Sequence, residues 1–129
     1  MISGINKISI YVDDQQAALE FWRDRCGFTV TTDATHDDYR WIEVASPNGA
    51  VVLAVLQHIE GAERIDAHVP ADQPTFAAML ATDDLQATHA ELVAAGVEFL
   101  ADPVEHFWGW WSMFTDGQGN RIALVPTGQ

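Results

Sequence analysis

The side chains best suited to binding a ligand are concentrated near the end of the chain, in the stretch HFWGWWSMF (residues 106–114). Three tryptophans and two phenylalanines fall within these nine residues. Flat aromatic rings bury large apolar areas and attract planar molecules and cations. In a strand, alternation would place Trp110 and Phe114 on one face and Trp111 on the other. The sequence leaves open whether these rings face a cavity, a partner subunit or the core.

The five histidines lack the spacing of a metal site. Preformed sites bring imidazole and carboxylate ligands together on one face of a helix or a strand. No two of the histidines have such a spacing; they are His36, His58, His68, His89 and His106. We therefore expect them to be scattered surface residues.

An internal repeat indicates which elements position these side chains. The stretch YVDDQQA (11–17) returns as ATDDLQA (81–87), with Asp13 and Asp14 matching Asp83 and Asp84 at a spacing of 70 residues. Each copy follows an alternating, strand-like segment and precedes a helix-like segment. An Asp at that point can cap the unpaired N–H groups of the helix that follows.

Two predicted hairpins complete the repeat, with turns at Pro47–Gly49 and Asp116–Asn120. The pattern predicts an α+β fold in a single domain, residues 1–129. It consists of two strand–helix–strand–strand–strand modules, 1–57 and 74–127, joined by a linker, 58–73.

Two such modules can each cover one sheet face with a helix and set the other faces around a shared cavity. Strand alternation predicts a mostly apolar lining with a few polar groups, which suits an organic ligand. The side chains expected to point inward are Lys7, Ser9, Tyr11, Val51, Leu53, Val55, Ala77, Met79, Ala81, Arg121, Ala123 and Val125.

The repeated modules, the stretch ALEFWRDRCGF (18–28) and the WG…DGQGN pattern near the end resemble the vicinal oxygen chelate superfamily. This superfamily includes glyoxalase I, extradiol dioxygenases, fosfomycin-modifying enzymes and bleomycin-resistance proteins. The resemblance covers nearly the whole chain, and Trp108 matches a tryptophan near the drug site of the bleomycin-resistance type. It also implies a homodimer.

The metal enzymes of that superfamily place His and Glu ligands at four inward strand positions. The resemblance assigns these positions to Lys7, Leu53, Ala77 and Ala123. Alanine and leucine have no donor atoms, and a protonated lysine would repel a cation. We therefore expect neither a metal nor another cofactor.

The chain is strongly acidic, with a formal net charge of −13 at pH 7. Nucleic acids and anionic membranes need basic surfaces, so we expect neither as a partner. The single cysteine, Cys26, cannot form an intramolecular disulfide, which is typical of a cytoplasmic protein.

These features predict a metal-independent protein that sequesters an aromatic compound, cationic or uncharged, in the manner of an antibiotic-resistance protein. Glu43 would pair with a cationic group. The residues expected to contact the ligand are Lys7, Tyr11, Trp41, Glu43, Leu53, Met79, Trp108, Trp110, Trp111, Phe114 and Arg121. The alternatives are a lyase, isomerase or dioxygenase without the usual metal ligands, using Lys7, Tyr11 or Glu43, and a regulatory or assembly subunit with a vestigial cavity.

Overall fold

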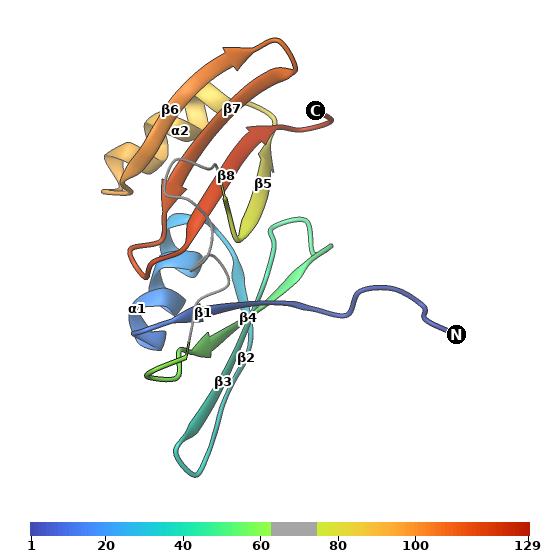
Figure 1. Ribbon diagram of the computed structural model, residues 1–129, viewed down its shortest axis with the longest axis vertical. Helices are drawn as coiled ribbons and strands as arrows, with labels where there is room; N and C mark the ends of the chain where they lie inside the picture. Colours follow the sequence, from blue (N-terminus) through green and yellow to red (C-terminus); the bar gives the residue numbers. More distant parts are fainter. Residues whose placement is uncertain (63–74) are drawn as a thin grey trace. The chain divides into compact units, whose positions relative to one another are not determined.

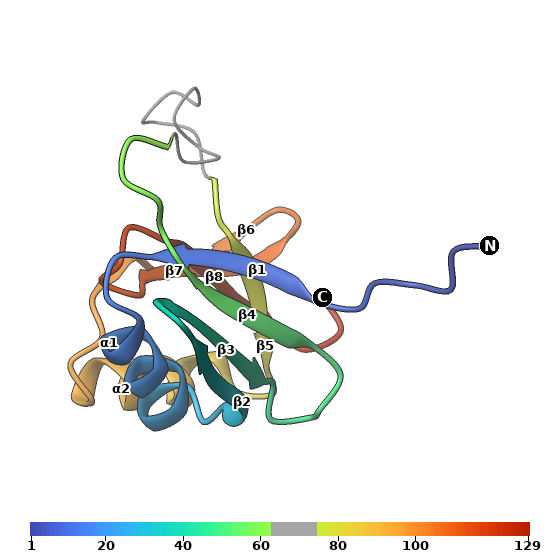
Figure 2. The ribbon, with the colours of Figure 1, turned by 90° about the horizontal axis from the view of Figure 1, so that it is seen from below.

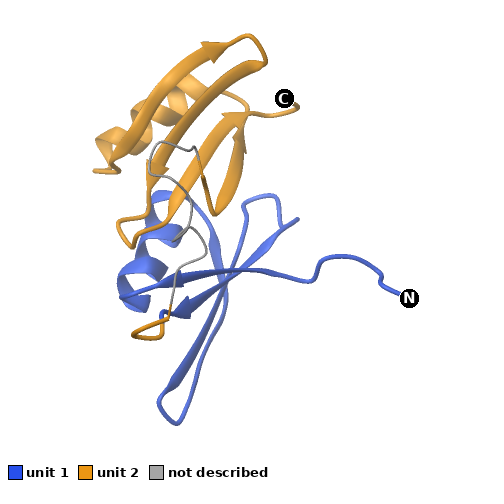
Figure 3. Ribbon diagram, in the orientation of Figure 1, with its two compact units in different colours: residues 1–58 blue, residues 59–129 orange. Residues whose placement is uncertain are grey.

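A computed structural model describes residues 1–62 and 75–129 of the chain (Figure 1). Most of the predicted linker, 58–73, and His68 therefore lie outside the described residues. The chain divides into two compact units, Met1–His58 and Ile59–Gln129 (Figure 3). Among the described residues, no helix is long and apolar enough to cross a membrane.

The first unit is a four-stranded sheet with one helical segment. Its elements are β1 (Ile8–Val12), α1 (Gln15–Glu20), a π-helical continuation η1 (Phe21–Arg25), β2 (Thr29–His36), β3 (Tyr39–Ala45) and β4 (Val52–Gln57). The strand order is β1-β4-β3-β2, with β1 and β4 parallel and the other pairs antiparallel.

The second unit repeats this arrangement. Its elements are β5 (Ala78–Thr82), α2 (Leu85–Ala94), β6 (Phe99–His106), β7 (Gly109–Thr115) and β8 (Arg121–Pro126). The order β5-β8-β7-β6 again pairs its first and last strands in parallel. In both views α2 runs along one face of its sheet (Figure 1 and Figure 2). The predicted α+β fold with two βαβββ modules is confirmed.

Both helices start at the aspartates that the repeat identified. The carboxylate of Asp14 accepts a hydrogen bond from the Ala17 N–H at 3.0 Å, and Asp84 accepts from the Ala87 N–H at 2.9 Å. Each cap satisfies a backbone donor that the helix leaves unpaired. The second Asp of each matching pair therefore sets where its helix begins.

The core of the first unit lies between the sheet and its helix. Ile10, Val55 and Ile42 are cross-strand neighbours, and all three are nearly or fully buried. Gln15 at the start of α1 donates to the carbonyls of Arg40 and Val55 at 2.9 and 3.0 Å, which ties the helix to β3 and β4. These contacts place α1 on the face that carries Ile42 and Val55.

The second unit packs in the same way. Phe114 and Ile122 are neighbours on β7 and β8 and are fully buried. Phe99 on β6 contacts the Phe114 ring at 5.4 Å between ring centroids and the His89 ring of α2 at 4.4 Å. The buried Ser112 hydroxyl donates to the carbonyl of Leu124 at 2.9 Å. Phe114 therefore belongs to the face that α2 covers.

The two modules differ in length at one turn. Ala45 pairs with Val52, so residues 46–51 form the first turn, whereas Thr115 pairs with Arg121, so residues 116–120 form the second. The first turn is one residue longer. The spacing of 70 residues therefore applies to β2 and β6 and to β3 and β7, and it becomes 69 at β4 and β8.

Candidate functional site

Each sheet has one face that points away from the helix of its own unit, which we call the distal face. In the first unit, Ser9, Ala54 and Glu43 form one row across β1, β4 and β3 on this face. Because side chains alternate along a strand, Lys7 and Tyr11 lie on the same face as Ser9, and Trp41 lies on the same face as Glu43. Four of the predicted ligand-binding residues therefore share one face.

Three of these residues are in direct contact. The ammonium Nζ of Lys7 lies 3.6 Å from Oε1 of Glu43. The indole N–H of Trp41 donates to the other carboxylate oxygen, Oε2, at 2.5 Å. Glu43 is the more buried partner, with 15% of its side chain exposed against 34% for Lys7. The carboxylate is therefore held from two sides, by an ion pair and by a hydrogen bond.

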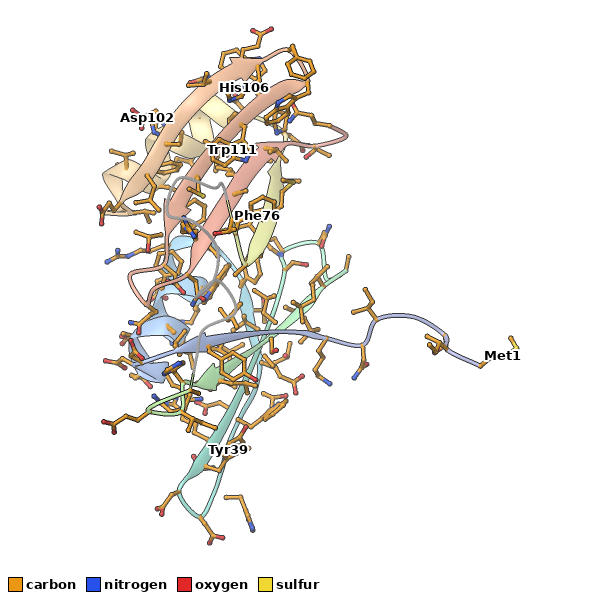
Figure 4. The ribbon with its side chains drawn as sticks, in the orientation of Figure 1. Met1, Tyr39, Phe76, Asp102, His106 and Trp111 are labelled. Carbon is orange, nitrogen blue, oxygen red and sulfur yellow. The ribbon has the colours of Figure 1, made fainter. Side chains whose placement is uncertain are left out.

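Aromatic rings border this polar group. The Tyr39 ring lies 6.2 Å from the Trp41 ring, and Tyr39 and Tyr11 are both exposed. Figure 4 labels Tyr39 near the tip of the β2–β3 hairpin. Tyr39 was not among the predicted ligand-binding residues, although its alternation with Trp41 and Glu43 in the stretch YRWIE could have identified it.

A second ion pair occupies the helix-covered face of the same sheet. The Arg40 guanidinium contacts Asp33 at 2.8 Å and also donates to the Gln16 side chain of α1 at 2.9 Å. The hydrogen bond from Arg40 holds the pKa of Asp33 below its ordinary value. The sheet thus carries the Lys7–Glu43 pair on its distal face and the Arg40–Asp33 pair on its helix-covered face. Variants of one ion pair can therefore serve as controls for variants of the other.

The distal face of the second sheet is apolar at its centre. Met79, Ala123 and Met113 form a row across β5, β8 and β7. Trp111, half-buried, lies beside Met113 on the same face of β7. By position in the repeat, Met113 takes the place of Glu43 and Trp111 that of Trp41. The tryptophan is therefore present in both modules, but the carboxylate is present only in the first.

Arg121 lies at the start of β8, where its guanidinium donates to the hydroxyl of Thr75. Trp108 lies in the turn between β6 and β7, half exposed, with its ring stacked on His106 at 4.8 Å and an interplanar angle of 6°. Figure 4 shows His106 and Trp111 on this hairpin. Both Arg121 and Trp108 thus have partners within the second unit.

Three predicted ligand-binding residues lie away from the distal faces. Leu53, which is 2% exposed, faces α1, because the longer first turn moves it one position along the strand relative to Ala123. Phe114 is fully buried against Phe99 and Ile122. The expectation that these two side chains contact a ligand is wrong, and Val55, also predicted to point inward, is fully buried beside Leu53.

Trp110 is the third of these residues, and it alternates with Ser112 on the helix-covered face of β7. It lies beside the start of α2 in a shallow depression of about 340 Å³. The residues lining the depression are Asp83, Asp84, Leu85, Gln86, Trp110 and Pro126. Gln129 holds the Trp110 backbone by donating to its carbonyl and accepting from its N–H.

The side chains at the expected metal positions do not suit a metal ion. Correcting the register replaces Leu53 by Ala54, so the four distal-face positions carry Lys7, Ala54, Ala77 and Ala123. None offers a donor for a cation except a lysine amine that is normally protonated. Across residues 1–62 and 75–129, no group of three or more His, Cys, Asp or Glu side chains is placed to hold a metal ion.

Comparison with known proteins gives consistent matches along the chain. The model of a family described as the Glyoxalase/Bleomycin resistance protein/Dioxygenase superfamily matches residues 4–124. The Bacillus subtilis (strain 168) protein YetH is 32% identical over 128 residues, 96% of this chain and 98% of its own.

Solved structures match over similar lengths. UcmS2 has a TM-score of 0.79 at 28% identity, covering 97% of this chain and 98% of UcmS2. TnmS3, an antibiotic binding protein from Streptomyces sp. CB03234, has a TM-score of 0.72 at 25% identity, covering 98% of each chain.

Proposed function

Because this chain belongs to the glyoxalase/bleomycin resistance protein/dioxygenase superfamily, we propose that it binds a small aromatic molecule without the help of a metal ion. The binding surface is the distal face of the first sheet, with Lys7, Tyr11, Trp41 and Glu43 as the central contacts. The resemblance to TnmS3, an antibiotic binding protein, supports a role in sequestering an antibiotic or a similar natural product.

The observation that carries this proposal is the contact of Glu43 with both Lys7 and Trp41 beside exposed tyrosines. The exposed rings supply apolar area, and the ion pair supplies hydrogen-bonding groups whose positions are fixed before a ligand arrives. Such preorganisation lowers the entropic cost of binding. A mostly apolar surface with a few fixed polar groups is typical of small-molecule sites.

Magnitudes indicate that both components are needed. Burying about 200 Å² of apolar ligand surface contributes about 5 kcal/mol. Micromolar affinity requires about 8 kcal/mol after the costs of association. Stacking alone falls short of this value, so hydrogen bonds to Lys7 and Glu43 are expected to contribute the difference.

The indole N–H signals of the five tryptophans provide a direct test. The ¹⁵N-labelled protein would be titrated with a panel of polycyclic aromatic antibiotics, with each signal assigned by single Trp→Phe variants. The signal of Trp41 is expected to shift, whereas that of Trp22, fully buried against Phe28, serves as an internal control. If the Trp41 signal stays in place across the panel, the proposal is wrong.

Two further measurements complete the test. Each compound that binds would be recovered and analysed by mass spectrometry, and an intact compound is expected. A chemically altered compound would instead identify the protein as an enzyme. Light scattering at several concentrations would test the homodimer that we propose from the family resemblance, and a monomer throughout would exclude it.

A further inference from the structure

The distal face of the first sheet carries equal and opposite charges. Among the described residues of β1 to β4 that point to this face, and the residue just before β1, Lys7 and Glu43 are the only ones with a formal charge when His36 of β2 is counted as neutral. Their charged atoms lie 3.6 Å apart. The formal charge of the chain is −13, but the charge on this face sums to zero.

The pairing follows from the sequence at three positions. Lys7 immediately precedes β1, Glu43 belongs to β3, and β4 lies between these two strands. Neighbouring strands lie about 4.8 Å apart, so Lys7 reaches across roughly 10 Å of sheet. The neighbour of Glu43 on β4 is Ala54, a small residue that pairs on its other side with Ser9, so Lys7 approaches Glu43 diagonally across the sheet. The Trp41 indole then fixes the far oxygen of Glu43.

The pair retains hydrogen-bonding capacity for a ligand. A lysine ammonium has three N–H donors, and each carboxylate oxygen accepts more than one hydrogen bond. Oε2 is engaged by Trp41, which leaves Oε1 beside the ammonium. A molecule lying on Trp41 and Tyr39 would meet a donor and an acceptor side by side. A cationic ligand would be attracted by Glu43 and repelled by Lys7. An anionic ligand would be attracted by Lys7 and repelled by Glu43.

From this geometry we infer that the ligand is a neutral aromatic compound whose edge carries a hydrogen-bond donor next to an acceptor. This inference rests on the proposed function and replaces the cationic ligand that the acidic composition and Glu43 suggested. The acceptor of the ligand binds the ammonium of Lys7, and its donor binds Oε1 of Glu43. The specificity of the site for charge then depends on the pair remaining intact.

Three naphthalene probes test the inference: 1-naphthamide, which is neutral with an N–H donor beside a carbonyl acceptor, 1-naphthylmethylammonium, a cation, and 1-naphthoate, an anion. Affinities would be measured by isothermal titration calorimetry on the full chain. The neutral probe is expected to bind most tightly to the unaltered protein. A cation bound more tightly than the neutral probe would overturn the inference.

Two variants are expected to change which probe the site prefers, from the neutral one to a charged one. Lys7→Met leaves Glu43 unpaired and is expected to favour the cation, while Glu43→Gln leaves Lys7 unpaired and is expected to favour the anion. Each preference should change by about tenfold, the effect of one hydrogen bond to a charged group. Lys7→Arg and Glu43→Asp keep both charges and should keep the neutral preference.

Asp33→Asn is the matched control, because it breaks the ion pair on the opposite face and changes the net charge as Glu43→Gln does. It should leave the order of the three probes unchanged. If Asp33→Asn shifts the order as much as Glu43→Gln, overall charge determines the selectivity and the inference is wrong. If the antibiotic panel shifts the Trp41 signal but none of the naphthalenes binds, the inference fails and the proposed function stands. If neither set binds, both fail.

Discussion

Trp41 and Glu43, two residues apart on β3, point to the same face of the sheet, and the Trp41 indole N–H donates to Oε2 of Glu43 at 2.5 Å. This hydrogen bond joins two residues of one strand, so it needs no group from another strand. It fixes the carboxylate and leaves Oε1 beside Lys7. The geometry of the polar group is therefore built into β3 before a ligand binds.

Replacing Trp41 by Phe keeps a ring but removes the N–H donor. Glu43, with 15% of its side chain exposed, then loses a hydrogen bond to its charged carboxylate. The free energy of unfolding is expected to fall by about 1.5–3 kcal/mol, measured by urea denaturation. Trp108→Phe is the control, because within residues 1–62 and 75–129 no carboxylate accepts a hydrogen bond from the Trp108 indole N–H, and its cost should be about 0.5 kcal/mol or less. Equal losses in the two variants would contradict this account of Glu43.

The ion pair between Asp33 and Arg40 makes stability depend on pH in the acid range. Because the hydrogen bond from Arg40 lowers the pKa of Asp33 in the folded state, its contribution is present above the unfolded pKa of about 3.9. It is lost as the pH falls through the lower folded value. Asp33→Asn should therefore be less stable at neutral pH, and the difference should shrink below about pH 4.

The size of this effect is limited by solvent, since 39% of the Asp33 side chain is exposed. The loss at neutral pH is expected to be about 1 kcal/mol or less, measured by urea denaturation between pH 3 and 7. Asp38→Asn makes the same change of charge in the exposed β2–β3 turn and serves as the control. A difference between wild type and Asp33→Asn that grows on acidification would refute the predicted sign.

The aromatic residues of the HFWGWWSMF stretch are predicted to contribute very unequally to stability. Phe114→Ala empties a fully buried position and should cost about 3–5 kcal/mol. Trp108→Ala removes a half-exposed ring stacked on His106 and should cost about 1.5 kcal/mol at most. Thermal unfolding measures both, and Phe114→Leu provides a folded variant if Phe114→Ala fails to accumulate. A larger loss for Trp108→Ala than for Phe114→Ala would mean that the core has been misassigned.

Removal of metal ions is expected to leave ligand binding unchanged. The four positions equivalent to the metal ligands of the superfamily hold Lys7, Ala54, Ala77 and Ala123, which do not suit a divalent cation. Titration of a compound that binds would be repeated after dialysis against EDTA and again after adding zinc or manganese. The metal content of the purified protein would also be measured by elemental analysis. A stoichiometric metal, or affinity lost with EDTA and restored by the metal, would contradict this prediction.

Much of the fold could be predicted from local chemistry. Asp14 and Asp84 cap their helices as the repeat indicated, and the two strand–helix–strand–strand–strand modules are present. The site was predicted only in part. Alternation within one strand correctly grouped Lys7 with Tyr11, because no turn intervenes between them. The contact of Lys7 with Glu43 depends on the order of three strands, which the spacing of residues along the chain does not reveal.

The errors have two physical causes. The spacing of 70 residues places Leu53 on the wrong face because the turn before β4 is one residue longer than the turn before β8. Phe114 was grouped with the ligand contacts because aromatic residues are common in both cores and binding sites. Only the packing of α2 beside β6 and β7 distinguishes these two environments, through the contacts of Phe99 with His89 and Phe114.

The extra residue in the turn 46–51 also bears on how the two halves of the chain have diverged. An insertion in a surface turn changes the entropy of loop closure only slightly. The same insertion within a strand would rotate every later side chain to the opposite face. An alignment of one half with the other must therefore open a gap between their third and fourth strands. The two halves keep the same strand order and the same parallel and antiparallel pairings, with bulges in β2 and β6, so any record of a common ancestral half is preserved in the pairing of backbones.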